Sequence, residues 1–297
     1  MSLPDIASQL VKESFADSNY NKTSSTIIMA GSKYVGKSTI INSFLEKNEN
    51  PKETLVLEYS FGRKSSQKPG GDKSICHVWE YGGKIEMLKD VLTSIPVHQK
   101  FFFCIVIDLS KGRNLWSTLE ACLEAIEKNY TAPNLLPEII LIGGNYHLFK
   151  NLDSETKKII CLTLRSIAVI YRAHVVFYSH KEATLVRRLK ELCYGMAFGK
   201  GFSLKEKNTN LSKPLVIPKG TDSWENIGVP ISTLTQIKLR YAAKIAMEQE
   251  TDVKQFSQMK RTHPEPVLDT LTALKCEDLV NMEYCDPSIK DYLYCLN

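Results

Sequence analysis

Residues 31–38 read GSKYVGKS and match the phosphate-loop pattern G-x-x-x-x-G-K-[S/T] at every fixed position. In such a loop Gly31 and Gly36 allow backbone N–H groups to converge on phosphate oxygens. Lys37 adds a positive charge near the β- and γ-phosphates, and Ser38 offers a hydroxyl to Mg²⁺. We therefore predict a nucleotide site with Ser38 as the magnesium ligand. Its residues are Gly31, Ser32, Lys33, Tyr34, Val35, Gly36, Lys37, Ser38 and Thr39.

The groups that a GTPase needs for hydrolysis are substituted. In small G proteins a later strand ends in D-x-x-G, and here the corresponding string is Glu80-Tyr81-Gly82-Gly83. Glu80 is one methylene longer than aspartate, so it can still reach a magnesium-bound water, but less rigidly. Lys84 follows where a glutamine orients the attacking water, and an ammonium cannot accept that water's proton. Thr54 is the candidate switch threonine, in a register that the sequence leaves open. No catalytic residue is predicted.

The residues that would read a guanine base are substituted as well. The motif N-K-x-D falls on residues 144–147, so that Asn145 replaces the stacking lysine and His147 replaces the base-pairing aspartate. A hydrogen bond to a charged partner contributes roughly 1.5–3 kcal/mol, so guanine preference should fall by orders of magnitude. The string Ser-His-Lys at 179–181 occupies the last guanine-loop position and is weak support. The expected ligand is a guanine or adenine nucleotide with Mg²⁺, held mainly through its phosphates.

The elements that must position these residues alternate along the chain. A short β-branched strand at 26–30 leads into the loop and a helix at 37–47 leaves it, which is the context that the motif requires. Further strands are predicted at 54–61, 74–80, 101–108, 138–144 and 174–179, with helices at 116–128 and 154–172. Apolar strands joined by helical crossovers predict an α/β, Ras-like P-loop NTPase fold. The expected architecture is a mostly parallel six-stranded sheet with helices on both faces, plus a C-terminal helical extension.

Four segments follow from this pattern: an N-terminal helical segment at 1–20, a Ras-like P-loop domain at 21–200, a connector with a short strand and a packed helix at 201–249, and a weakly patterned tail at 250–297. Within the domain, the polar stretch 62–73 is expected to be a surface loop. The helix at 231–249 carries one apolar stripe, and we favour its packing on its own domain over a partner. The stripe consists of Leu234, Ile237, Tyr241 and Ile245.

Composition excludes several functions. The chain has 297 residues, 43% of them hydrophobic, and a net charge of +5, which is too weakly basic to argue for nucleic acid. The apolar run Phe101–Ile107 is far shorter than the about twenty residues of a membrane-spanning helix, so no membrane insertion is expected. The N-terminus has no basic region typical of a signal peptide. Eight cysteines without a C-x-x-C pair indicate reduced, intracellular thiols rather than disulfides or zinc.

Other candidates favour structural roles. Asp108 ends an apolar strand, and a turn or cap role is favoured over a metal-binding acid. Trp79 is expected to be a core anchor, and the basic run 187–190 a solvated helix face or part of a partner surface. Four of the six histidines, as candidate metal ligands, share no ligand spacing that would indicate a metal site; they are His77, His98, His174 and His180. A small P-loop kinase is disfavoured because no lid or acceptor motif is recognisable.

Several strings along the sequence, taken in order, resemble the light intermediate chains of cytoplasmic dynein. The resemblance runs from about residue 20 to about residue 235 and includes GSKYVGKST, TLVLEYSFGRK, HVWEYGG, FCIVIDLSKGRNLW and IGGNYHLF. The strings LEYSFGR, WEYGG and LVIPKGTDSWENIG are typical of the dynein 2 branch of that family. The resemblance implies a Ras-like domain with degraded GTPase motifs that serves as a non-catalytic motor subunit.

For the dynein 2 branch, the implied partners are the dynein 2 heavy chain, other dynein 2 subunits and the intraflagellar transport machinery. The implied role is to stabilise the heavy chain for retrograde transport and cilium assembly. The implied location is the cytoplasm, the cytoskeleton and the cilium, at the basal body and axoneme. An active regulatory P-loop NTPase switch remains the alternative hypothesis. It also needs the base reader, the metal-positioning acid and the water-positioning group, which are substituted at His147, Glu80 and Lys84.

Overall fold

A computed structural model describes residues 24–65, 74–98, 100–131, 136–199, 207–245 and 266–280. The predicted N-terminal helical segment at 1–20 lies outside these residues. The chain divides into two units, 1–247 and 248–297. The first unit holds the sheet and the phosphate loop. The second holds helix α11 (Pro266–Val280), within the stretch for which the sequence shows little pattern.

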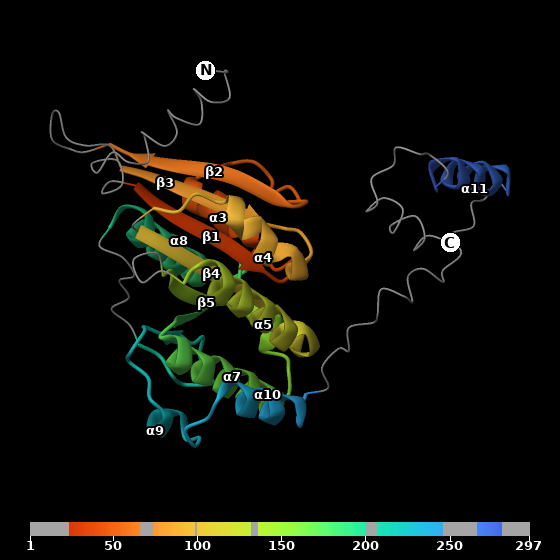
Figure 1. Cartoon of the computed structure of the whole chain (residues 1–297). Helices are drawn as coiled ribbons and strands as arrows, with labels where there is room; N and C mark the ends of the chain where they lie inside the picture. The colour runs from red at the N-terminus through yellow and green to blue at the C-terminus, as the bar shows by residue number, and fades with distance from the viewer. Residues whose placement is uncertain are drawn as a thin grey trace. The chain divides into compact units, whose positions relative to one another are not determined.

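The first unit is built on a seven-stranded sheet in the order β2-β3-β1-β4-β5-β6-β7 (Figure 1). The strands are β1 (Ser24–Gly31), β2 (Leu57–Lys64), β3 (Ser74–Tyr81), β4 (Lys100–Asp108), β5 (Glu138–Gly144), β6 (His174–Phe177) and β7 (Val216–Ile217). The five central strands are parallel, whereas β2 and β7 pair antiparallel at the two edges. The mostly parallel sheet is as predicted, but the predicted number of six strands is wrong. The short strand expected beyond residue 213 joins the sheet as β7.

Helices cover both faces of the sheet (Figure 1). The helices are α3 (Lys37–Leu45), α4 (Leu88–Val91), α5 (Gly112–Asn129), α6 (Tyr146–Phe149), α7 (Ser154–Tyr171), α8 (Ala183–Phe198), α9 (Trp224–Ile227) and α10 (Leu234–Ala242). Alternate residues of β4 separate the two cores. Phe103 and Ile105 pack with α5 and α7, and Phe102 and Cys104 pack with α3 and α8. A strand buried on both faces needs the continuous apolar run that the sequence has here.

The edge strand β2 differs most from its prediction. It begins at Leu57 rather than residue 54, and it continues to Lys64 through residues that were expected to be loop. Gly62 and Lys64 pair with Cys76 and Ser74 of β3, so the antiparallel partner extends the strand. Residues 66–73 of the predicted loop lie outside the described part of the chain.

Helix α10 packs on its own domain, as favoured from its stripe. Ile237 and Tyr241 are buried, and the Tyr241 hydroxyl donates to the carbonyl of Gly112 at 2.5 Å. Lys238 adds an ion pair with Glu120 at 2.7 Å. The helix begins at residue 234 rather than at the predicted 231, because Thr233 and Gln236 form a capping box, and it ends at Ala242; residues 246–249 of the prediction lie outside the described residues.

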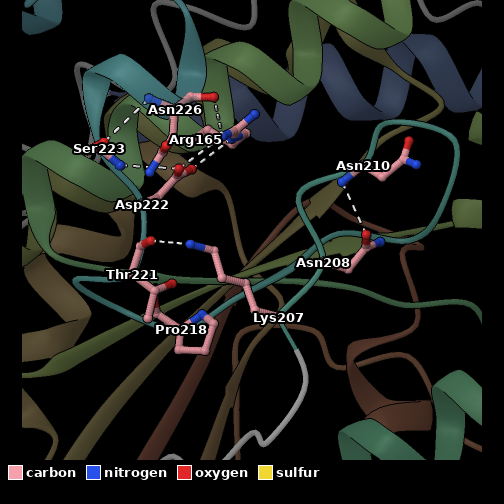
Figure 2. A network of polar contacts seen from close by, with 9 residues as sticks. All are labelled: Arg165, Lys207, Asn208, Asn210, Pro218, Thr221, Asp222, Ser223 and Asn226. Carbon is pink, nitrogen blue, oxygen red and sulfur yellow. Dashed lines mark hydrogen bonds and ion pairs between the residues drawn. The ribbon is translucent and has the colours of Figure 1, made fainter.

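A buried ion pair fixes the segment between β7 and α10. Arg165 on α7 meets Asp222 with Nε–Oδ2 at 2.7 Å and Nη2–Oδ1 at 2.9 Å, and both side chains are less than a tenth exposed (Figure 2). The same guanidinium donates to the carbonyl of Asn226 at 3.1 Å. The planar fork of arginine suits this bidentate contact, so the connector is anchored to the domain rather than loosely attached.

The described residues also bear on membrane-spanning segments and on the state of the cysteines. Within that part of the chain, none of the helices has the length and apolarity needed to cross a bilayer. Buried free cysteines are present in both core layers, and they are Cys76, Cys104, Cys122, Cys161 and Cys193.

Candidate nucleotide-binding site

The phosphate loop connects the end of β1 to the start of α3. Gly31 has φ of +133°, and a Cβ there would lie 2.0 Å from the carbonyl oxygen of Val106 on β4. Gly36 precedes the helix with φ of +93°. Only glycine allows this close approach and these backbone angles, so the loop is pressed against the neighbouring strand and curls around the N-terminus of α3.

Ser32 and Val35, two of the predicted site residues, direct their side chains away from the cleft. The Ser32 hydroxyl accepts from the backbone N–H of Asp108 at 3.1 Å, and Val35 is buried against Gly144. The Asp108 carboxylate accepts from the backbone N–H and hydroxyl of Ser110, at 3.0 and 2.6 Å. Asp108 is therefore a turn residue, as favoured from the sequence, and it supports the phosphate loop through its backbone.

Lys37 is buried beneath the loop. Its Nζ donates to the carbonyl of Ser32 at 2.8 Å and lies 3.4 Å from the carbonyl of Gly31. Burial lowers the pKa of this ammonium, and the charge of Glu80 opposes the shift. The cation therefore lies folded back under the loop, next to the position where the motif places phosphate oxygens.

Ser38 and Glu80 lie in contact at the expected magnesium position. The Ser38 hydroxyl donates to Oε1 of Glu80 at 2.7 Å, and Glu80 is only 5% exposed. Burial raises the pKa of Glu80, whereas the hydrogen bond from Ser38 and the charge of Lys37 lower it. A hydroxyl beside a carboxylate is the kind of oxygen donor set that Mg²⁺ takes, so these residues fit the metal.

Thr54 faces the same cluster from the segment before β2. It is 8% exposed, and its hydroxyl donates to Oε2 of Glu58 at 3.0 Å. Thr54, the candidate switch threonine, therefore lines the same cleft as Ser38 and Glu80. Glu58 lies directly opposite Glu80 across the β2–β3 pair.

The cleft that results has a volume of about 300 Å³ and is lined by the phosphate loop, the segment 51–54 and the end of β3. Lys33 and Tyr34 form its outer wall, and the Tyr34 hydroxyl donates to Oε1 of Glu53 at 3.1 Å. Sequence reasoning missed Glu53 and Glu58. No motif marks them, because their contacts depend on how the segment before β2 folds back over the loop.

The residues at the base position meet at the ends of β5 and β6. Nδ1 of His147 lies 3.0 Å from the Ser179 hydroxyl, and the His180 ring is 5.0 Å away in an edge-on arrangement. Asn145 has φ of +54° and caps the short helix α6, whereas Tyr146 is buried. The loops that read a base in a GTPase are therefore adjacent here, with imidazole groups where the motif has a carboxylate.

Lys84 does not face the phosphate cleft. Its side chain is exposed, and its carbonyl accepts from the buried Tyr81 hydroxyl at 2.5 Å. This bond fixes the chain just after β3. The substituted position therefore supplies a backbone acceptor for the core rather than a group that could orient water.

The remaining candidates have structural roles. Trp79 is partly buried on the sheet with its ring 4.8 Å from that of Tyr59, so it joins the core as expected. Arg187 is exposed beside Glu191, and Lys190 pairs with Glu46 at 2.7 Å, which fits a solvated helix face. Across the described residues, no group of three or more His, Cys, Asp or Glu could hold a metal ion.

The fold and the phosphate loop define a P-loop NTPase-like α/β protein. No protein-family model matches the chain. The chain is 33% identical to cytoplasmic dynein 2 light intermediate chain 1 of Danio rerio, over 73% of this chain and 70% of that protein. It is 34% identical to the Bos taurus protein of the same name, over 69% and 68%. The chain therefore belongs to the family of cytoplasmic dynein 2 light intermediate chains.

A more distant relative is septum-promoting GTP-binding protein 1 of Schizosaccharomyces pombe, at 24% identity over 62% of this chain and 88% of that protein. Among solved structures, the conserved domain of a dynein light intermediate chain aligns with 77% of this chain and 92% of that one. The TM-score is 0.45 and the identity 14%, and at this level the likeness adds nothing to the assignment.

Proposed function

We propose that the chain is a non-catalytic subunit of the cytoplasmic dynein 2 motor. It binds and stabilises the heavy chain for retrograde intraflagellar transport and cilium assembly, and it acts in the cytoplasm, on the cytoskeleton and at the cilium. The observation that carries this proposal is the 33–34% identity to dynein 2 light intermediate chains over about 70% of both sequences. Because a subunit acts by occupying a surface, it needs an intact fold rather than intact catalytic groups.

The nucleotide site supports a binding role without hydrolysis. The phosphate loop is complete, and the contact between Ser38 and Glu80 keeps oxygen donors at the metal position. Lys84 is exposed and His147 stands at the base position. We therefore assign the site to a nucleotide that is held through its phosphates with Mg²⁺ at Ser38, and we regard the domain as a degenerate GTPase.

The proposal is tested by removing the protein from ciliated cells and restoring it with variants. Without it, heavy-chain levels should fall, cilia should be short, and transport particles should accumulate at the tips. Heavy chain co-purified with the full chain, and with a truncation ending at residue 247, measures the interaction directly. Normal cilia and normal heavy-chain levels in the null cells would refute the subunit role.

The alternative is a regulatory NTPase switch, and the retained contact between Ser38 and Glu80 is the observation that favours it. Lys37→Ala separates the two functions because it removes the phosphate-binding cation. A Lys37→Ala protein that is stable and binds heavy chain normally should restore transport if the subunit role is sufficient. If such a protein fails to restore transport, nucleotide binding controls function and the switch hypothesis holds.

A further inference from the structure

Two segments flank the phosphate cleft in the positions that move in a GTPase switch. In such switches the γ-phosphate and its Mg²⁺ order these segments, which relax when the phosphate leaves. In this chain the segments are residues 51–56, before β2, and residues 82–84, after β3. Both are held by contacts with other parts of the protein.

The centre of segment 51–56 is fixed by Thr54. Its hydroxyl donates to Oε2 of Glu58 at 3.0 Å, and the residue is only 8% exposed. The N–H of Gly82 donates to the carbonyl of Val56 at 2.9 Å, and a Cβ on Gly82 would lie 1.8 Å from the carbonyl oxygen of Thr54. The two segments are thus in direct backbone contact, at a separation that only glycine permits.

The phosphate loop itself provides a further anchor. Tyr34 has φ of +58°, and its hydroxyl donates to Oε1 of Glu53 at 3.1 Å. Its side chain is 76% exposed, so the hydrogen bond links the loop to segment 51–56 at the solvent side of the cleft. A tyrosine at positive φ is uncommon and costs conformational energy, and here the strained residue presents its hydroxyl to the segment.

The second segment, residues 82–84, is fixed by a side chain of the core. Tyr81 is 2% exposed, and its hydroxyl donates to the carbonyl of Lys84. A Cβ on Gly83 would lie 2.7 Å from the same hydroxyl, so the chain turns tightly around the tyrosine. The path of residues 82–84 is therefore set by a core side chain.

A ligand can shift a conformational equilibrium only by its difference in affinity for the two states. When the segments are already in place, a γ-phosphate gains nothing by ordering them. We infer that Tyr34, Thr54 and Glu58 fix segment 51–56 over the phosphate cleft, so that this segment keeps the same conformation with a nucleoside diphosphate and with a triphosphate. This rests on the nucleotide binding proposed above.

Affinity and hydrogen exchange test this directly on the full chain stripped of nucleotide. With Mg²⁺ present, GDP and a non-hydrolysable GTP analogue are each added at saturation, which their measured Kd values establish. Amide exchange in 51–56 and 82–84 should be the same in both complexes. Exchange in 51–56 that is more than about threefold slower with the triphosphate analogue than with GDP would overturn the inference.

Variants at Tyr34 and Glu58 test the hydrogen bonds that hold segment 51–56, with no ligand present. Tyr34→Phe and Glu58→Gln each remove or weaken one hydrogen bond, so amides in 51–56 of the ligand-free protein should exchange about three- to tenfold faster. Tyr194→Phe is the matched control, because Tyr194 is a half-exposed tyrosine on α8. Exchange that is unchanged in both anchor variants would overturn the inference.

The two proposals fail in different ways. If neither di- nor triphosphates bind, and Lys37→Ala behaves like the parent protein, the nucleotide-binding part of the proposed function is wrong. The exchange rates of the ligand-free variants still decide whether segment 51–56 is fixed. If nucleotides bind and a γ-phosphate protects that segment, nucleotide binding stands and the fixed-segment inference is wrong.

Discussion

The Ser38 hydroxyl donates a hydrogen bond to Oε1 of Glu80 over 2.7 Å, joining the first turn of α3 to the end of β3. This contact brings together two motifs that are far apart in the sequence, the phosphate loop and the degenerate acidic motif. In the nucleotide site proposed above, the longer glutamate side chain takes the place of the magnesium-positioning acid. The residues around it, however, provide neither the usual base reader nor the usual water-positioning group.

Nucleotide preference should be weak. Because His147 and Asn145 replace the aspartate and lysine of the base motif, GDP and ADP should compete for the purified protein with less than about a tenfold difference, or about 1.4 kcal/mol. Competition against a fluorescent nucleotide measures this. A guanine preference of several hundredfold would mean that another residue reads the base.

Hydrolysis should be very slow. Lys84 is exposed and cannot position water, so single-turnover rates with bound GTP or ATP should not exceed about 5 × 10⁻⁴ s⁻¹, the order of unassisted small G proteins. Lys89→Ala, at a second exposed lysine, is the matched control for Lys84→Ala. A fast turnover that Lys84→Ala or Glu80→Gln abolishes, and Lys89→Ala does not, would contradict the pseudo-enzyme interpretation.

The ion pair between Arg165 and Asp222 should be important for stability. Asp222→Asn leaves a buried guanidinium without its charged partner, which should cost about 3–5 kcal/mol in the free energy of unfolding. Glu191→Gln, in an exposed ion pair, should change that free energy by less than about 0.5 kcal/mol. Urea denaturation measures both, and similar small losses in the two variants would be inconsistent with a buried anchor.

Acid should destabilise the protein through Glu138 and His174. The hydrogen bond from His174, with help from Lys219, lowers the pKa of Glu138 to about 2, and burial lowers the pKa of His174. The carboxylate's stabilisation is complete above its ordinary pKa of 4.5 and is lost as the pH falls toward about 2. Because burial keeps His174 neutral in the folded protein, the unfolded chain takes up a proton first, and a further loss of stability begins as the pH falls below the ordinary pKa of 6.5. Stability should therefore decrease with falling pH in both ranges.

Glu138→Gln separates the contribution of Glu138 from that of His174, because the variant has no carboxylate to titrate and so lacks the loss of stability at the lower pH. Thermal melts from about pH 3 to about pH 7, a range that covers the ordinary pKa values of both groups, would show a flatter acid limb in this variant. A limb that is as steep as in the parent protein would show that other carboxylates dominate acid unfolding.

Local signals predicted much of this structure. Glycine spacing and apolar runs act over short distances, so they predict the phosphate loop, the strand at 26–30 before it and the helix at 37–47 after it; the structure has β1 at Ser24–Gly31 and α3 at Lys37–Leu45. The central strands β4 and β5 followed from continuous apolar stretches, which a strand covered on both faces requires. The role of Asp108 as a turn residue was also apparent from its place at a strand end.

Edges and contacts over long sequence separations were decided only by the tertiary structure. The extent of β2 depends on its antiparallel partner, and β7 joins the sheet because β6 offers an open edge. The contacts of Tyr34 with Glu53 and of Thr54 with Glu58 arise where the chain folds back over the phosphate loop. The sequence by itself determined which segments form strands, helices and the loop, since those preferences are local. The pairing of edges and polar side chains depends on which partners the folded chain brings within reach.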